Sequence, residues 1–378
     1  MKPRIIIGFI PLLDAASLLI AADKGFAARE GIDLELVREV SWSNIRDRLA
    51  IGHYDAAHLL APMAIAATLG LSHVRTPLIA AMNLAANGNA ITVSPTLHAR
   101  LQEKATGDLA DPAVSARALR EIIRDGERRG AEPLTFGMTF PFSTHNYQLR
   151  YWMAEGGVDP DRDLRLVVVP PSYMVENIAK EQLDGFCVGA PWNAVAADAG
   201  VGVILHPGRA IVHPAPEKTL ALRAVFAERD PQLVQALIRA CLAAAEFVKA
   251  PENRAEVAAL LARPDRVGVE AEILHRTLDG RLSANTQSEI PDYLIFGDRL
   301  SGRPDPAQAA WLYAQMRRWG QAAPSQEQAA QARRAFNPGC FDAATGAVAP
   351  PPSPITAFAG PDFDSDKVEE YVSAFATR

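Results

Sequence analysis

Short apolar runs alternate with amphipathic segments along the first half of the chain. Residues 5–10 (Ile-Ile-Ile-Gly-Phe-Ile) form a continuous apolar run, typical of a parallel strand that is buried on both faces. The Ala- and Leu-rich segment 15–29 predicts a helix that ends at Gly31, where glycine can adopt the left-handed cap. Residues 32–37 alternate apolar and charged positions, which predicts a second strand. This order of elements predicts an α/β fold with a parallel sheet covered by helices on both faces.

The alternation continues to about residue 190, and the pattern is mainly helical from residue 230. Further strands are expected at 54–60, 78–82, 90–94, 134–138, 166–169 and 185–188, and helices at 43–49, 63–69, 147–155, 174–180, 233–249, 254–261, 307–319 and 326–334, with a charge-rich helical region up to 129. The proline-rich tail from residue 349 is expected to wrap a surface.

We expect two lobes, the first formed by 1–93 with 190–378 and the second by 94–189. The crossings between them would lie near Val93 and Gly189. Open α/β sheets bind ligands beyond the carboxyl ends of their strands, so the cleft between the lobes is the expected ligand site.

Composition narrows the class of protein. A chain of 378 residues with 49% hydrophobic and 22% charged residues is typical of a globular protein of two lobes or domains. Its net charge of -6, without a dense Lys/Arg block, argues against nucleic-acid binding. Three widely spaced cysteines (Cys187, Cys241 and Cys340) favour a reducing compartment and lack metal-site spacing. We see no apolar stretch long enough to cross a membrane.

The amino-terminal segment bears on the cellular compartment in which the protein is expected. The apolar run at 5–10 is too short for the core of a secretory signal, and no small-residue cleavage site follows it. It is better interpreted as the first buried strand. If Met1 is the native start, this predicts a cytoplasmic protein.

The most informative segment runs from Asp184 to Asn193, with the sequence Asp-Gly-Phe-Cys-Val-Gly-Ala-Pro-Trp-Asn. Glycine beside a large aromatic residue suits a place where the backbone approaches something small. Lys218 follows downstream in Pro-Glu-Lys. A cation brought to such a place indicates a small anion, although Lys218 could equally be a solvated surface lysine.

These motifs point to a family. The residues concerned are Lys24-Gly25-Phe26, Ser41-Trp42, the Asn-Gly-Asn-Ala-Ile-Thr string from Asn87, Thr144-His145, Arg150-Tyr151-Trp152, Val168-Val169-Pro170-Pro171, the 184–193 string and Pro216-Glu217-Lys218. Over most of its length the chain resembles the nitrate/bicarbonate-type substrate-binding proteins of ABC transporters. The resemblance implies a two-lobed periplasmic-binding-protein-like fold. The missing leader favours the branch of cytoplasmic nitrate/nitrite sensors called NasS, whose members hold an RNA-binding antiterminator, NasT, inactive until the ligand arrives.

The resemblance also implies a set of ligand-binding residues: Trp42, Asn89 (where transport members tend to carry glutamine), Ser143, Thr144 and His145 (where they are richer in glycine), Gly189 and Lys218, with Pro191 and Trp192 in support. A flat trigonal anion could lie against the Trp42 indole and receive in-plane hydrogen bonds. We expect the anion to bridge Trp42 and Asn89 in one lobe and His145 in the other. Trp42 could instead be a core aromatic, and His145 a structural loop histidine.

The leading interpretation is a sensor that binds nitrate or nitrite and releases a NasT-like partner when the lobes close. The alternative is an extracytoplasmic receptor that delivers nitrate or bicarbonate to an ABC transporter. An enzyme that shares the fold, such as a pyrimidine-synthase relative, is less well supported, because no nucleophile–base pair or metal motif is present. Asp14, Glu176 and Asp184 lack calcium-loop spacing, so neither a metal nor a cofactor is expected.

Overall fold

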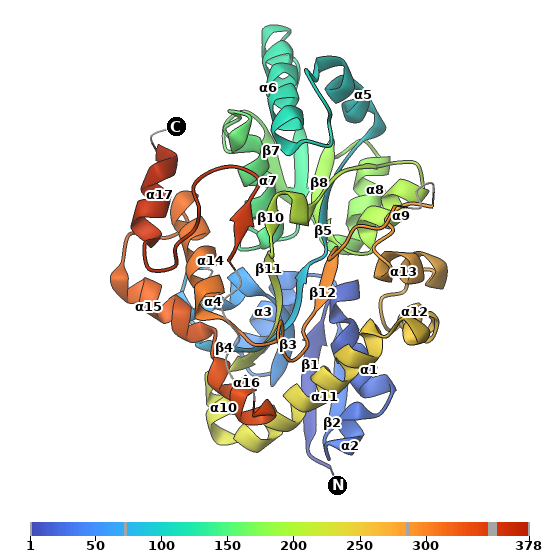
Figure 1. Cartoon of the computed structure of the whole chain (residues 1–378), viewed down its shortest axis with the longest axis vertical. Coiled ribbons are helices and arrows are strands. Elements are labelled where there is room, and N and C mark those ends of the chain that lie inside the picture. Colours follow the sequence, from blue (N-terminus) through green and yellow to red (C-terminus); the bar gives the residue numbers. More distant parts are fainter. Residues whose placement is uncertain (1, 72–73, 285–287, 347–353, 377–378) are drawn as a thin grey trace.

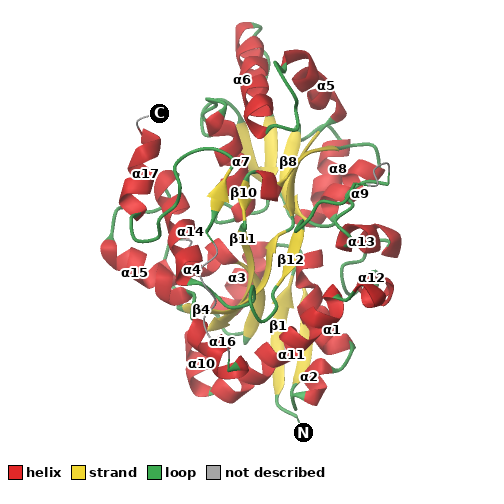
Figure 2. Ribbon diagram, in the orientation of Figure 1, coloured by secondary structure: helices red, strands yellow, loops and turns green. Residues whose placement is uncertain are grey.

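The computed structural model describes residues 2–71, 74–284, 288–346 and 354–376. Two α/β lobes are stacked along the long axis of the molecule (Figures 1 and 2), with the amino terminus at the free end of the first lobe. Each lobe has its own sheet, of six strands in the first and five in the second.

The first sheet is mixed. Its strand order is β12-β4-β11-β3-β1-β2, with β1 Arg4–Phe9, β2 Asp33–Arg38, β3 Ala56–Leu60, β4 Leu78–Asn87, β11 Pro216–Arg223 and β12 Leu294–Phe296. Strands β1, β2 and β3 are parallel, whereas β11 runs antiparallel to both β3 and β4. The prediction of a parallel sheet was therefore wrong, because each of the two sheets also contains antiparallel pairs. The chain re-enters the first lobe at the cleft end of β3, where Lys218 pairs with Leu60, and must run back in the opposite direction.

Helices cover both faces of this sheet. They are η1 Leu13–Ala15, α1 Ala16–Asp23, α2 Phe26–Arg29, α3 Trp42–Ala50, α4 Ala61–Leu69, α10 Ala224–Arg229, α11 Pro231–Lys249, α12 Arg254–Leu261, α13 Ala271–Leu278, α14 Pro306–Arg318, α15 Gln326–Ala335 and α16 Pro338–Thr345, with the short 3-10 turn η4 Pro251–Asn253. Another 3-10 turn, η3 Gly208–Ala210, lies between the lobes. The single helix expected over 15–29 is broken at Gly25, which has φ +71°. Trp42 opens α3 and Ser41 caps it, so this helix begins one residue before the expected range of 43–49.

Helix α11 packs against α1 in the core of the first lobe. Among the helices that the structure describes it alone is long and apolar enough to cross a membrane, which the sequence pattern did not single out. However, 56% of its apolar window is buried inside the protein. It therefore serves as a core helix of this fold.

The second sheet has the order β7-β6-β8-β5-β9, with β5 Asn89–Val93, β6 Thr135–Met138, β7 Arg165–Val168, β8 Gly185–Gly189 and β9 Val203–Pro207. Its helices are α5 Pro95–Lys104, α6 Pro112–Arg128, α7 Thr144–Glu155, η2 Pro171–Tyr173, α8 Met174–Ala179 and α9 Trp192–Asp198. The expected second lobe, 94–189, omits β5 and β9, yet β5 pairs with both β8 and β9. Strand pairing thus extends the second lobe at both ends.

The crossings between the lobes are consequently at Asn87-Gly88 and at 208–215, not near Val93 and Gly189. Asn87 has φ +60°. Its amide nitrogen donates to the Asp292 carbonyl at 2.8 Å and lies 3.1 Å from His213 Nδ1, and its amide oxygen accepts from Ala215 N–H at 2.8 Å. One asparagine therefore ties both crossing strands to the segment that leads into β12.

The carboxyl-terminal segment contacts both lobes. Strand β13 Thr356–Ala357 pairs with β10 Val212–His213, next to the second crossing. The Tyr151 hydroxyl of α7 donates to the Ala359 carbonyl at 2.6 Å, and α17 Val368–Ala376 packs against α14 (Figure 1). Residues 354–376 thus lie along the surface as expected, while 347–353 fall outside the described residues.

Candidate functional site

A buried ammonium group lies between the two lobes. Lys218 Nζ is 2.6 Å from Glu217 Oε1 and 2.9 Å from Asp14 Oδ2, and all three side chains are at most 2% exposed. Burial disfavours the charged form of Lys218, but the two carboxylates raise its pKa. Burial also opposes ionisation of Asp14, yet Lys218 and His58 hold its pKa at about 2. The lysine is therefore a fixed positive charge in a dry environment.

A β-bulge explains how two consecutive residues reach the same site. In a regular strand, adjacent side chains point to opposite faces of the sheet. The register between β11 and β4 shifts between Pro216 and Lys218 and again before Thr219. Such a bulge re-aims a side chain, and here Glu217 and Lys218 form an ion pair with each other.

The first lobe supplies an aromatic wall. Lys218 Nζ lies 5.6 Å from the centre of the Trp42 ring, within the range of a cation–π contact. The His58 ring is 5.5 Å from the same indole, and its Nε2 is 2.9 Å from Asp14 Oδ1. Burial lowers the pKa of His58, with Asp14 opposing the shift. Trp42, His58 and Asp14 come from α3, β3 and the turn after β1, which meet at one end of the first sheet.

The second lobe closes the site with Asn89 and His145. Asn89 Nδ2 donates to Gln148 Oε1 at 3.1 Å and to Glu217 Oε2 at 2.7 Å. Because both partners are acceptors, the amide orientation is fixed by the network. His145 Nδ1 is 3.1 Å from Thr139 Oγ1 and 3.5 Å from Glu217 Oε1. Burial first, and then the Lys218 charge, hold the pKa of His145 well below its usual value.

Gly189 provides close approach of the backbone. A Cβ at this position would lie 3.3 Å from Asp14 Oδ2 and 3.6 Å from Asn89 Oδ1. Its backbone does not require glycine, because it ends a regular strand that is paired with Asn89 in β5. The absence of a side chain instead lets the backbone pass close to two buried oxygen atoms, because a methyl group would crowd the Asp14 carboxylate.

Several buried polar atoms around Lys218 have no hydrogen-bond partner among the described residues: Trp42 Nε1, His58 Nδ1, Asn89 Oδ1 and His145 Nε2. A buried polar group without a partner costs roughly 1–3 kcal/mol. Four such groups from four different elements, surrounding one ammonium, are costly without a ligand. A small polar molecule that accepts hydrogen bonds would satisfy Trp42 Nε1 and His145 Nε2 among these four atoms.

A model of the NMT1-like family matches residues 1–262. The chain belongs to the NMT1-like family. It is 33% identical over 329 residues to the nitrate/nitrite binding protein NrtA of Nostoc sp., an alignment that covers 83% of this chain and 70% of that protein. It is also 33% identical over 324 residues to the nitrate import ATP-binding protein NrtC of Synechocystis sp., covering 84% of this chain but only 46% of NrtC. The chain thus spans about half the length of the ATP-binding relatives that it matches.

Solved structures agree with this family assignment. The crystal structure of the periplasmic nitrate-binding protein NrtA from Synechocystis PCC 6803 has a TM-score of 0.89 and 26% identity, covering 98% of each chain. The ligand-binding component of an ABC-type import system from Staphylococcus aureus has a TM-score of 0.68 at 17% identity, over 92% of this chain and 100% of that one, and shows the fold alone. The two-lobed binding-protein fold predicted from the sequence is confirmed.

Within this NMT1-like protein, most of the residues implied by the resemblance come together. Trp42, Asn89, His145, Gly189 and Lys218 all lie at the buried ammonium site. The expected distribution between lobes was wrong for Asn89, which opens β5 of the second sheet and so lies on the same side as His145.

The hydroxyl groups of Ser143 and Thr144 form hydrogen bonds within the protein that fix α7 and β11. The Ser143 hydroxyl accepts from Asn146 N–H at 3.1 Å and donates to the Phe140 carbonyl at 2.6 Å, so it caps α7. The Thr144 hydroxyl donates to the Pro216 carbonyl at 2.6 Å, a bond from the second lobe to β11. Both hydroxyl protons are therefore already used within the protein. The segment expected to be a loop is the first turn of α7, whose positive dipole end lies at His145.

The two supporting residues link the lobes. Pro191 precedes α9, and Trp192 Nε1 donates to the Pro11 carbonyl at 3.2 Å. In the same region, Leu13 N–H donates to the Ala190 carbonyl at 2.9 Å. These contacts fasten the end of β8 to the turn that carries Asp14.

Sequence reasoning missed His58, Glu217 and Gln148, and it considered Asp14 only as a metal ligand. The available signal for Glu217 was its place in the Pro-Glu-Lys motif itself. Across the described residues, no group of three or more His, Cys, Asp or Glu side chains is arranged to hold a metal ion. Cys187 and Cys241 are buried, and Cys340 is half-buried.

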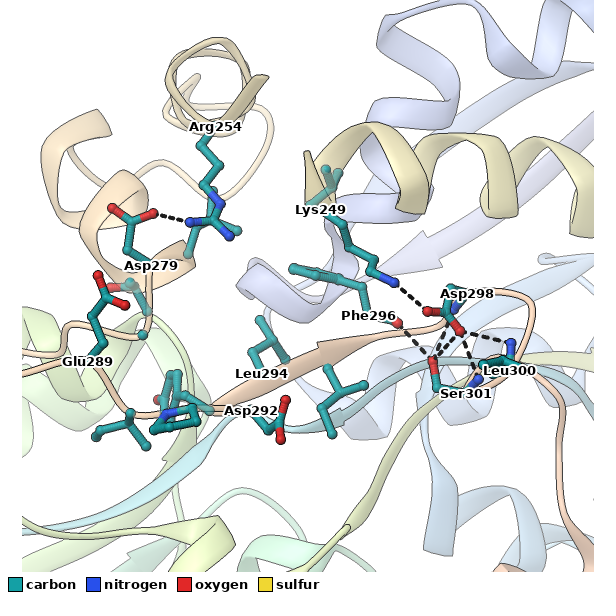
Figure 3. A pocket seen from close by; sticks show the side chains of 18 residues that line it. Lys249, Arg254, Asp279, Glu289, Asp292, Leu294, Phe296, Asp298, Leu300 and Ser301 are labelled. Carbon is teal, nitrogen blue, oxygen red and sulfur yellow. Dashed lines mark hydrogen bonds and ion pairs between the residues drawn. The ribbon is translucent and has the colours of Figure 1, made fainter. Parts of the chain in front are cut away.

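A separate open cavity of about 520 Å³ is lined by residues of the edge strand β12 and of the segments on either side of it (Figure 3). Two of its carboxylates are neutralised, because Lys249 pairs with Asp298 and Arg254 donates to Asp279 at 2.5 Å. Glu289 and Asp292 are exposed to solvent. The carboxylates of this cavity therefore have ion-pair partners or contact solvent, whereas several polar atoms around Lys218 are buried without a partner.

Proposed function

We propose that this protein binds a small planar oxyanion, of which nitrate and nitrite are the best candidates, between its two lobes. The observation that carries this proposal is the buried Lys218 ammonium beside the Trp42 indole, with unpartnered Trp42 Nε1 and His145 Nε2 around it. Lys218 would supply charge, and the two nitrogen atoms would donate hydrogen bonds to anion oxygens. The indole face would lie against the flat anion.

The family relatives support the same class of ligand. The relatives include proteins named as nitrate/nitrite binding and bicarbonate transport proteins. By this comparison, we propose that the chain acts as the substrate-binding component of an ABC import system for nitrate or bicarbonate. The interlobe bonds, such as that from Thr144 to Pro216, would form as the lobes close on the ligand.

A thermal-shift screen of nitrate, nitrite, bicarbonate and chloride tests the ligand class. A ligand present at 100 times its dissociation constant stabilises the folded state by about 2.7 kcal/mol. We expect nitrate or nitrite to raise the melting temperature and chloride to leave it unchanged. The matched control is Lys218→Met, in which the shift should disappear; equal shifts with all four anions would contradict a specific site.

A second candidate function is the sensor role, in the cytoplasm, with a NasT-like antiterminator as partner. Closure of the lobes around the ligand would give the conformational change that such a sensor needs. Partner co-purification with and without nitrate, together with fractionation of cells that produce the native gene product, separates the two roles. Equal recovery of the antiterminator in both conditions would dismiss the sensor, whereas nitrate-dependent association with a permease would favour import.

A further inference from the structure

The charges buried at the site do not suit an anion alone. Lys218 contributes one positive charge, and Asp14 and Glu217 contribute one negative charge each. With both imidazoles neutral, the empty site carries one net negative charge. Adding a monovalent anion would leave two uncompensated negative charges in a dry interior, which is strongly unfavourable.

Glu217 is held as an ionised carboxylate by its hydrogen bonds. Asn89 donates to its Oε2 at 2.7 Å, and Lys218 donates to its Oε1 at 2.6 Å. Burial raises the pKa of Glu217, and the Lys218 charge opposes that shift. The network therefore keeps this negative charge next to the expected position of the ligand.

His145 is the group best placed to receive a compensating proton. Its Nδ1 faces Thr139 Oγ1 at 3.1 Å and Glu217 Oε1 at 3.5 Å, while its Nε2 is buried without a partner. A doubly protonated imidazole would donate from Nδ1 towards the Glu217 carboxylate and from Nε2 towards the anion. The charges that act on the ring are those of Lys218 on β11 and Asp14 on η1, beside the Glu217 carboxylate. The other titratable groups that interact with these charges are His58 on β3, Cys187 on β8 and Tyr293 before β12.

Asn89 also indicates that a proton accompanies the anion. Its Nδ2 is committed to two acceptors, so its unpartnered Oδ1 can satisfy itself only with a hydrogen-bond donor. Nitrate has no proton to donate, whereas bicarbonate carries one. The acceptor atoms at this site therefore need a hydrogen-bond donor, and its proton arrives with the anion or from solvent.

We propose that the site binds its monovalent oxyanion together with one proton. This proton is shared between the ligand and the acidic side of the site, which is formed by Asp14, Glu217 and Asn89 Oδ1. When the ligand brings no proton, His145 is the side chain that takes one up. This inference rests on the proposed oxyanion function and defines the chemical form of its ligand.

Because anion binding and proton binding are thermodynamically linked, the direction of the pH dependence of nitrate affinity can be derived. In the empty closed site, burial and Lys218 keep the pKa of His145 low and the ring neutral. An arriving anion favours the protonated ring and raises that pKa, so nitrate binding takes up a proton and strengthens as pH falls. Between the two pKa values, affinity should fall about tenfold for each unit rise in pH.

Calorimetric titration of the full chain in phosphate and in Tris at the same pH measures the proton count directly, because the two buffers differ in ionisation heat. We expect uptake of about one proton per nitrate. A smaller uptake with bicarbonate would show that the proton comes from the ligand, and an equal uptake would place it on the protein. Zero uptake with nitrate would overturn the inference while leaving the oxyanion function intact; no binding of either anion would overturn both.

His145→Gln tests the assigned side chain. Glutamine keeps a donor but cannot titrate, so nitrate should bind more weakly and the proton uptake should fall towards zero. His53→Gln is the matched control, because His53 is exposed on the first lobe, and its proton uptake should equal that of the unchanged protein. Full uptake in His145→Gln would remove His145 from the role.

Discussion

The Lys218 ammonium lies 5.6 Å from the centre of the Trp42 indole, and both groups are buried in the first lobe. The sequence predicted that both residues bind one small anion, and its expected lobe bounds placed both in the first lobe. The first lobe does hold the cation and the aromatic wall, and the second lobe brings His145, Asn89 and Gly189 over them. Lobe closure therefore completes a half-site that the first lobe already contains.

Replacement of Lys218 should have a large effect. Lys218→Met would leave the Asp14 and Glu217 carboxylates buried without their cation, and breaking a buried ion pair in this way costs roughly 3–5 kcal/mol. We expect nitrate binding to be lost in calorimetry and the melting temperature to fall. The double variant Glu217→Gln/Lys218→Met should recover part of the stability but not the binding. Unchanged affinity in Lys218→Met would place the ligand elsewhere.

Trp42→Phe separates hydrogen bonding from packing. Phenylalanine keeps an aromatic face but removes Nε1, which has no partner within the described residues. The loss of one neutral hydrogen bond should weaken nitrate binding by about 0.5–1.5 kcal/mol. Ligand-dependent tryptophan fluorescence should disappear in this variant and persist in the control Trp319→Phe. A signal that survives in Trp42→Phe would contradict contact between the indole and the anion.

Gly189→Ala should lower affinity more than stability. The new methyl group would lie 3.3 Å from Asp14 Oδ2 and occupy the space next to Asn89 Oδ1. Since Gly189 is not in the left-handed region, the strand can accept alanine without backbone strain. We expect weaker nitrate binding in calorimetry with a nearly unchanged melting temperature. A comparison variant, Gly8→Ala, should instead unfold more easily, because its Cβ would lie 2.4 Å from the Tyr54 ring.

Asn87 should control the crossing between the lobes. Asn87→Gly keeps the left-handed backbone accessible but removes the bonds to Asp292 and Ala215, whereas Asn87→Ala also adds backbone strain. We expect both variants to melt earlier, with the alanine variant lower by about 1 kcal/mol of unfolding free energy. An alanine variant as stable as the glycine variant would show that the strain is relieved elsewhere.

The sequence identified much of this site because its motifs mark places where strands end. Gly189 and Asn89 are paired neighbours at the ends of β8 and β5, so two motifs far apart in the chain describe one corner of the second sheet. The hydrophobic pattern also located most strands within one or two residues, including β1 and β2.

The features of the site that the sequence did not predict depend on how strands far apart in the chain pair with each other. No strand was predicted around Lys218, yet the residue lies in a central strand, because β11 fills the gap between β3 and β4. The shared orientation of Glu217 and Lys218 comes from a bulge that no local pattern reveals. The role of Asp14 depends on His58 and Lys218, which come from other strands, so its chemistry could not be derived from neighbouring residues.

A crystal structure determined with nitrate would show where the anion binds. We expect one anion in the buried site, within hydrogen-bonding distance of Lys218 Nζ, Trp42 Nε1 and His145 Nε2, with its plane against the indole. Nitrate bound elsewhere, with these three nitrogen atoms making no contact to it, would rule out the Lys218 site.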